Sequence, residues 1–185
     1  TKRGFIAVKS NCSLQSYVPA LHPIKDVYGL NRVLVCTYQA ISGAGKTFER
    51  WPEMVDNLIP YIGGEEEKSE QEPLKLWGKV ENGAIVPAAS PSITAQCLRI
   101  PVTDGHMAAV FMSFDKKPTK EEILDRWANF EGEAQRLALP SAPHADTLKI
   151  ASRLGANCFC GILFGLAILA ALAMGCTPKK YWALI

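Results

Sequence analysis

Cys12 is the residue best placed for covalent chemistry, because of the elements expected on either side of it. An apolar run at 4–8 predicts a strand, Ser10 and Asn11 open a polar turn, and a helical pattern begins at Leu14. A cysteine at or near a helix N-terminus meets exposed backbone N–H groups and the positive end of the helix dipole, which favour the reactive thiolate. A buried, inert cysteine is the alternative, and it is the commoner fate of a lone cysteine.

A nucleophilic cysteine needs a base within reach. Of the three histidines, His22 falls in the helix predicted after Cys12 and is expected to be structural, whereas His144 borders an apolar tail. His106 opens an apolar strand just after a turn, seven residues beyond Arg99. A histidine at a strand end is often only a tolerated polar residue, so spacing alone does not select His106.

Glu72 and Lys75 are three residues apart, so on a helix both side chains would project from one face. They could bind a charged ligand together, or form a solvated surface ion pair. The charge pattern by itself favours the surface pair.

Residues 40–47 (AISGAGKT) satisfy a loose phosphate-loop pattern, and 109–115 could supply the strand with a magnesium-binding aspartate. A phosphate-loop nucleotidase is therefore a minor alternative. Two features oppose it. Ala40 replaces the first glycine, whose backbone N–H should be exposed to phosphate, and Pro52 interrupts the helix that should follow.

Residues 1–143 have the pattern of an α+β domain. Strands are predicted at 33–36, 93–100 and 106–114, the last two joined by a short connection. Thr119 and Glu122 form a capping box, which predicts a helix with Ile123, Trp127 and Phe130 on one face.

Composition changes near residue 144, and 144–185 form an atypical segment. Residues 154–178 contain no charged side chain, which predicts an apolar C-terminal helix, and lysine and arginine side chains flank them. About 20 such residues span a bilayer. The segment could be a membrane anchor, or a buried helix that packs against a missing domain.

The bulk composition excludes several partners. The chain has 20 basic and 18 acidic residues, so its near-balanced charge gives no reason to expect nucleic acid. Its six cysteines are scattered without zinc-site spacing, so we expect no metal and a reducing, cytoplasmic compartment. The chain opens at Thr1 with no signal peptide, and it reads as the middle of a longer protein.

Four separated segments occur in an order typical of one enzyme family: SNCS at 10–13, TYQAISGAG at 37–45, EPLKL at 72–76 and CLRIPVTDGH at 97–106. Over residues 1–143 the chain resembles the catalytic and dimerisation domain of aspartate-semialdehyde dehydrogenase of the fungal and archaeal type. The resemblance implies a mixed, largely antiparallel sheet with helices packed on one face. It also implies a homodimer that buries broad sheet surfaces.

By this resemblance, the chain takes part in the NADP-dependent reduction of aspartyl 4-phosphate to aspartate semialdehyde, in the biosynthesis of lysine, methionine and threonine. Cys12 would attack the acyl phosphate to form a thioester. His106 would be the general acid and base, because histidine titrates near pH 6.5. Gln39 would orient the reacting group.

The remaining site residues implied by the resemblance bind substrate and cofactor. Arg99 matches the arginine that holds the substrate carboxylate, where its planar guanidinium can bind two oxygens. Glu72 matches the acid that meets the ammonium group. Phosphate would be bound by Lys75 and Asn11, and Ser42 and Gly43 would lie against the nicotinamide end of NADP.

The chain departs from the family in two respects. Residues 144–185 do not align with the glycine- and alanine-rich helix that ends the family's chains. The glycine-rich turn of a nucleotide-binding domain does not occur in the sequence. The N-terminal nucleotide-binding domain is therefore missing, and we expect the chain alone to be inactive. The alternative function is a non-catalytic dimerising homologue, with or without a membrane tether.

Overall fold

The computed structural model describes residues 10–139. The strand predicted at 4–8, His144 and the whole segment 144–185 lie outside the described residues, and the apolar helix predicted at 154–178 lies there too. Four α-helices, three short 3₁₀ helices and five strands lie within them. In chain order they are η1 (Leu14–Ser16), α1 (Val18–Tyr28), β1 (Leu30–Gln39), η2 (Ile41–Ala44), η3 (Pro52–Met54), α2 (Glu65–Leu76), β2 (Lys79–Glu81), β3 (Ala84–Val86), β4 (Ser92–Arg99), β5 (His106–Phe114), α3 (Lys120–Ala128) and α4 (Glu133–Arg136).

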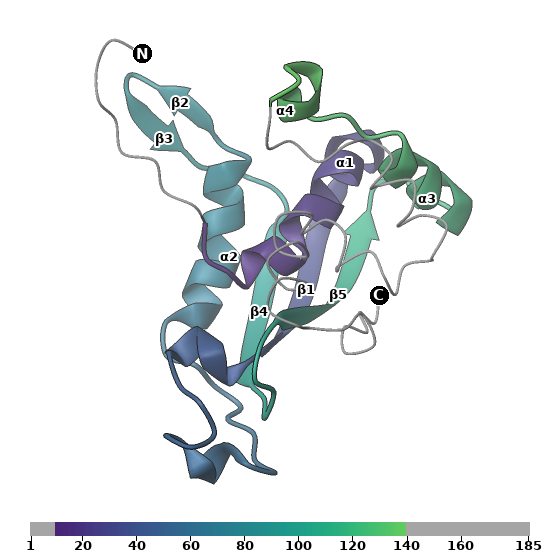
Figure 1. Cartoon of the computed structure of the whole chain (residues 1–185). Helices are drawn as coiled ribbons and strands as arrows, with labels where there is room; N and C mark the ends of the chain where they lie inside the picture. The colour runs from purple at the N-terminus through teal and green to yellow at the C-terminus, as the bar shows by residue number, and fades with distance from the viewer. Residues whose placement is uncertain (1–9, 140–185) are drawn as a thin grey trace.

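Within residues 10–139 the main sheet has three strands in the order β4-β1-β5, with β1 parallel to β4 and antiparallel to β5 (Figure 1). A separate hairpin joins β2 and β3. The predicted mixed sheet with helices is confirmed, and the strands predicted at 33–36, 93–100 and 106–114 correspond to β1, β4 and β5. The short connection from β4 to β5 does not form a hairpin, because β1 lies between them.

The β4–β5 connection crosses the end of β1 and binds the segment that follows it. Backbone N–H groups of Ala40, Ile41 and Ser42 donate to carbonyl groups of the connection at 3.2, 2.9 and 3.2 Å. These bonds fix η2 over the end of the sheet. An α-helix after Lys46, which the phosphate-loop alternative requires, does not occur: the next α-helix among residues 10–139 is α2, which begins at Glu65.

One face of the sheet forms the core. Val33 and Val35 of β1 are buried there and pack with Ile93 of β4, Ala108 of β5 and the helical segments η1 and α1. Burying one such side chain stabilises the fold by roughly 1.5–3 kcal/mol. The alternation along β1 therefore decides which side chains, including Thr37 and Gln39 further along the same face, point towards the helices.

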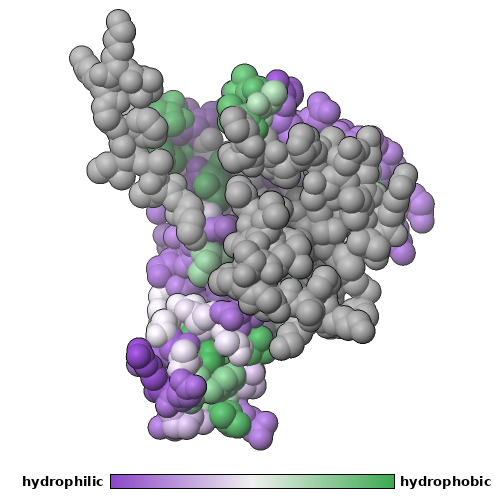
Figure 2. Space-filling model, in the orientation of Figure 1, coloured by the Kyte–Doolittle hydropathy of each residue, from purple (hydrophilic) through white to green (hydrophobic). Residues whose placement is uncertain are grey.

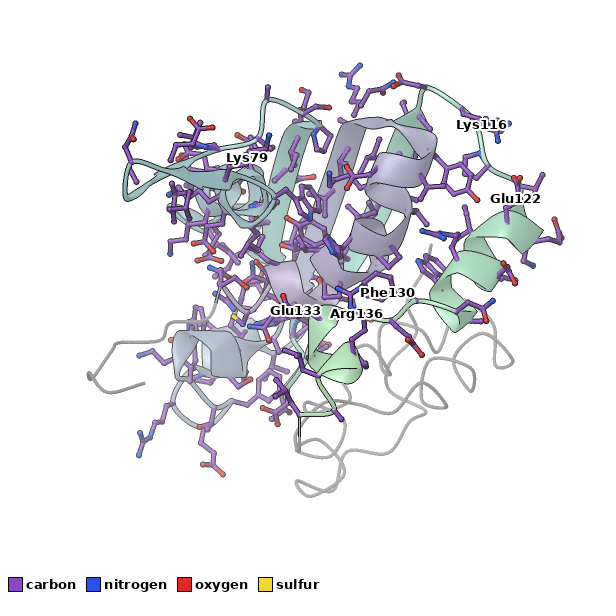
Figure 3. The ribbon with its side chains drawn as sticks, turned by 90° about the horizontal axis from the view of Figure 1, so that it is seen from above. Lys79, Lys116, Glu122, Phe130, Glu133 and Arg136 are labelled. Carbon is purple, nitrogen blue, oxygen red and sulfur yellow. The ribbon has the colours of Figure 1, made fainter. Side chains whose placement is uncertain are left out.

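The described part of the chain leaves the opposite face of the sheet open. Viewed from above, α1 lies on one side of the strands, and no helix of residues 10–139 covers the other (Figure 3). Leu34 of β1 is 40% exposed there, and its partner Phe111 of β5 is 69% exposed.

The predicted capping box begins α3. The Glu122 N–H donates to the Thr119 hydroxyl at 3.2 Å, and the Thr119 N–H donates to the Glu122 carboxylate at 2.8 Å. Trp127 is buried against α1 and donates its indole N–H to the Ala20 carbonyl at 2.8 Å. The helix ends at Ala128, before Phe130, which nevertheless packs in the same cluster.

The segment between β1 and α2 forms the lower lobe of the molecule in Figure 1, and its surface mixes hydrophilic and apolar residues (Figure 2). None of the helices within residues 10–139 has the length and apolar character to cross a membrane.

Candidate active site

Three of the predicted site residues form a row across the end of the sheet. Gln39, the last residue of β1, pairs with Arg99 on β4 and with His106 on β5. Paired residues of neighbouring strands project from the same face of a sheet. The row therefore faces the helices, and it brings together residues that no local sequence pattern connects.

Cys12 lies against one end of this row. Its Sγ atom is 3.2 Å from Nε2 of His106, and the cysteine is exposed at the surface. This distance allows direct proton transfer between thiol and imidazole.

The other ring nitrogen of His106 has two partners. Nδ1 lies 3.2 Å from the Ala40 N–H and 2.9 Å from the Gly105 carbonyl. When Nδ1 accepts from Ala40, the Nε2–H of the neutral ring can donate to a thiolate. When Nδ1–H donates to Gly105, Nε2 can accept the thiol proton. The surroundings thus serve both tautomers, as a group that gives and takes protons requires.

The turn that carries Cys12 is held by Asn11. The Asn11 carbonyl oxygen accepts from the backbone N–H and the hydroxyl of Ser13, both at 2.9 Å. A 3₁₀ turn, η1, follows at Leu14, and α1 begins only at Val18. The helical pattern predicted from Leu14 thus begins there as a 3₁₀ turn, and the α-helix that contains His22 follows at Val18.

Glu65, the first residue of α2, is a site residue that the sequence analysis missed. Its carboxylate accepts from the Asn11 side-chain amide at 3.1 and 3.0 Å, from the Gln39 amide at 3.4 Å and from the Lys68 ammonium at 3.0 Å. Burial raises the pKa of Glu65, but the hydrogen bonds from Lys68, Asn11 and Gln39 outweigh burial, so its pKa lies below the ordinary value.

Arg99 is buried beside Glu65 and Cys12. One guanidinium N–H donates to the Ala40 carbonyl at 2.8 Å, and only 6% of the residue is exposed. Burial lowers the pKa of Arg99, and the charges of Glu65 and Cys12 oppose this shift. An arginine remains a cation at neutral pH even so.

Gly43 of η2 lies directly over this cation and the imidazole. A Cβ atom at Gly43 would lie 2.9 Å from Cε1 of His106 and 3.0 Å from Nη1 of Arg99. Glycine therefore keeps a flat backbone surface above both groups. Its neighbour Ser42 is exposed.

Glu72 and Lys75 lie further along α2. Glu72 accepts from the backbone N–H of Asn11 at 2.9 Å, so it contacts the cysteine turn. Lys75 is exposed, and its side chain has no hydrogen bond or ion pair with any residue of 10–139. At 1.5 Å of rise per residue, Lys75 lies about 15 Å along the helix from Glu65.

The pair that the structure places beside the row is Glu65 and Lys68, which has the same spacing as Glu72 and Lys75. The position of Glu65 directly after Gly63 and Gly64 indicates a helix start, but it does not show that this pair lies beside Cys12. Of the nine predicted site residues, Lys75 is the one that the structure leaves away from the others.

A family model described as "Semialdehyde dehydrogenase, dimerisation domain" matches residues 21–163, and so continues past the boundary predicted at residue 143. The chain belongs to this family of semialdehyde dehydrogenases.

The curated relatives of the chain are named aspartate-semialdehyde dehydrogenase, a specific member of this family. The aspartate-semialdehyde dehydrogenase of Methanothermobacter thermautotrophicus is 44% identical over 140 residues, which cover 76% of this chain and 40% of the relative. The Schizosaccharomyces pombe enzyme of the same name is 39% identical over 145 residues, with the same coverage of both chains. The predicted resemblance to the archaeal and fungal enzymes is confirmed.

A solved structure of aspartate-semialdehyde dehydrogenase with NADP from Candida albicans has a TM-score of 0.65 and 35% identity. The match covers 76% of this chain and 40% of that one. The chain therefore spans about 40% of the length of the curated relatives named above.

Proposed function

We propose that this chain is the catalytic and dimerisation part of an NADP-dependent aspartate-semialdehyde dehydrogenase, which reduces aspartyl 4-phosphate to aspartate semialdehyde in the biosynthesis of lysine, methionine and threonine. The observation that carries the proposal is the 3.2 Å contact between Cys12 and His106 at the end of the Arg99–Gln39–His106 row.

The chemistry starts at sulfur. The Cys12 thiolate attacks the acyl carbon of the substrate, a C–S bond forms, the C–O bond to phosphate breaks, and phosphate leaves. A bound nicotinamide cofactor would supply the hydride that reduces the thioester, and the C–S bond would then break to release the aldehyde and the Cys12 thiolate. His106 takes the thiol proton before the attack and returns a proton when the aldehyde is released. The Gln39 amide, buried beside His106, orients the reacting carbonyl group.

The charged residues fit the ends of a small amino acid. Arg99 would bind the substrate carboxylate with the N–H groups that Ala40 does not use. The geometry favours Glu65 over Glu72 for the substrate ammonium group, because Glu65 lies beside Gln39 and Arg99. Lys68 replaces Lys75 as the phosphate-binding cation for the same reason.

Asn11 would act differently from the prediction. Its amide oxygen is occupied by Ser13, and its nitrogen donates to both Glu65 oxygens. We assign it the task of holding the Cys12 turn, with a contact to phosphate only if the Glu65 bonds open.

The residues of η2 fit a flat cofactor ring. Gly43 leaves above His106 a space that a Cβ atom would fill, and exposed Ser42 lies beside it. These two residues would contact the nicotinamide end of NADP. The rest of the cofactor would be bound by a domain outside this sequence.

The open face of the sheet would be the homodimer interface. Leu34 and Phe111 are exposed there, and the partly buried Cys36, Tyr38 and Met107 extend the same face. Burial of such a face against a second copy would remove apolar surface from water. We place the enzyme in the cytoplasm, the reducing compartment that the scattered cysteines favour.

A chimera tests the function. The nucleotide-binding part of the Methanothermobacter relative would be joined to this chain, and NADPH oxidation with aspartyl phosphate measured. We expect turnover by the chimera, none by the Cys12→Ser chimera, and none by the chain alone. Turnover by the chain alone would contradict the proposal that it needs a separate nucleotide-binding domain. A folded, dimeric chimera without turnover would favour the non-catalytic dimerising homologue.

A further inference from the structure

The edge of the main sheet beside β4 is closed by α2 and a short β-bridge. β4 pairs with β1 on one side, so alternate backbone N–H groups on its other side need partners. Those of Ala95 and Cys97 donate to the carboxylates of Glu70 and Glu66, both at 3.0 Å. The next, that of Arg99, donates to the Ile59 carbonyl at 2.9 Å. We call the Glu66 and Glu70 bonds the edge clamp.

The edge clamp follows from a match of repeat lengths. Four residues of α-helix rise about 6 Å, and two residues of strand advance about 6.6 Å. A helix that runs opposite to β4 can therefore present a carboxylate to every second outward N–H group. Glu66 and Glu70 have this spacing, and Figure 1 shows α2 lying alongside β4.

Closing the sheet edge with two glutamates has a cost in free energy. Like charges four residues apart on a helix repel each other. One oxygen of Glu66 is also buried without a hydrogen-bond partner among the described residues, which costs free energy. A requirement for precise placement of α2 would explain why carboxylates occupy these positions.

The other side of α2 contacts the cysteine turn. Glu65 and Glu72 hold the side chain and the backbone N–H of Asn11, and the Tyr17 hydroxyl donates to the Ser69 carbonyl at 3.0 Å. The helix therefore connects β4 to the segment that carries Cys12. A shift of α2 along β4 would move Cys12 relative to His106, which is fixed on β5.

We propose that Glu66 and Glu70 are positioning residues, which set α2 against the edge of the sheet and so hold Cys12 in contact with His106. The proposal rests on the proposed thiol chemistry of Cys12. It assigns to the two half-buried carboxylates a task that no substrate contact provides.

The test uses the whole chain and two readouts. Hydrogen exchange of the Ala95 and Cys97 amides, followed by NMR, reports the clamp itself. The rate of Cys12 alkylation by iodoacetamide across pH, resolved by peptide mass spectrometry, reports the Cys12–His106 contact. The variants are Glu66→Ala and Glu70→Ala, with Glu67→Ala as the matched control, because Glu67 is exposed on the same helix.

We expect each clamp variant to speed exchange of its own amide about tenfold, as loss of a charge-assisted hydrogen bond implies. We also expect slower Cys12 alkylation at neutral pH and an altered pH profile. Glu66→Gln and Glu70→Gln, whose amide oxygens still accept, should restore both readouts. They also keep the test decisive if an alanine variant does not fold.

Unchanged amide exchange in a folded clamp variant would show that the two glutamates do not bind the Ala95 and Cys97 amides. Faster exchange with an alkylation profile equal to that of Glu67→Ala would overturn the positioning role. Failure of the proposed enzyme function would look different: the chimera would not turn over, while the clamp variants would still alter alkylation.

Discussion

Nε2 of His106 lies 3.2 Å from Sγ of Cys12, although 94 residues separate them in the chain. His106, on β5, is the last residue of the row that also contains Arg99 and Gln39. Cys12 reaches it because α2 binds the neighbouring Asn11 and holds the cysteine turn against that row.

Replacement of His106 by Asn should slow Cys12 alkylation at neutral pH. The substituted amide cannot take up the thiol proton, whereas the imidazole can. In a complete enzyme, loss of a general acid and base typically costs 10²–10⁴-fold in rate. Peptide-resolved alkylation rates provide the measurement, with His22→Asn as the control. Equal rates in His106→Asn and the native chain would show that the contact has no chemical consequence.

Gly43→Ala should disturb the site without backbone strain, because the φ angle of Gly43 lies outside the left-handed region. The added methyl group would meet Cε1 of His106 at 2.9 Å and Nη1 of Arg99 at 3.0 Å, so one of the two side chains must move. We expect slower Cys12 alkylation with a nearly unchanged melting temperature. Ala44→Ser, on the same 3₁₀ turn, is the control and should have the native alkylation rate.

Glu65 predicts a specific dependence of stability on pH. Its pKa is lower in the folded chain than in the unfolded chain, so its ionised form favours folding. This contribution is present above the ordinary glutamate pKa of about 4.3 and is lost as the pH falls through the lower folded value. Urea unfolding of Glu65→Gln should therefore show a smaller loss of stability on acidification below about pH 5. A slope equal to that of the native chain would contradict the depressed pKa.

Trp127 should contribute much of the stability of the contact between α1 and α3. Trp127→Ala removes a buried ring and the hydrogen bond to Ala20, and should cost about 3–5 kcal/mol in the free energy of unfolding. Urea denaturation measures this value. Lys120→Ala, an exposed change on the same helix, should alter stability by less than about 0.5 kcal/mol.

Phe111→Lys should shift the chain towards monomer if the open sheet face is the dimer interface. The residue is 69% exposed in a single chain, so the change should leave the fold intact. Sedimentation velocity would follow the oligomeric state. Val80→Lys, at an equally exposed apolar residue of the β2–β3 hairpin, is the control. An unaltered dimer in Phe111→Lys would place the interface elsewhere.

The strands and the α3 capping box could be predicted from sequence, because alternation and the Thr119–Glu122 spacing are local signals. The sequence did not allow a choice between the two equally spaced glutamate–lysine pairs of α2. Glu65 with Lys68, and Glu72 with Lys75, read alike along the chain. Which pair lies beside Cys12 depends on how far α2 extends along β4, a tertiary register that no local pattern encodes.

The position of β1 between β4 and β5 could not be predicted from the sequence either. A short connection between two apolar runs favours a hairpin, and the parallel pairing of β4 with β1 depends on contacts distant in sequence. The α-helix begins later than the helical pattern does for a local reason: the amide oxygen of Asn11 accepts from the Ser13 N–H, and the chain continues into a 3₁₀ turn before α1.

The most direct measurement of the central claim is the first half of the reaction on the chain alone, which needs no cofactor. Aspartyl phosphate would be mixed with stoichiometric protein, and released phosphate and intact mass followed together. We predict about one phosphate per chain, with the acyl group on Cys12 and neither product from Cys12→Ser. Phosphate release unchanged by Cys12→Ser, or an acyl group on another cysteine, would contradict the assignment of Cys12 as the nucleophile.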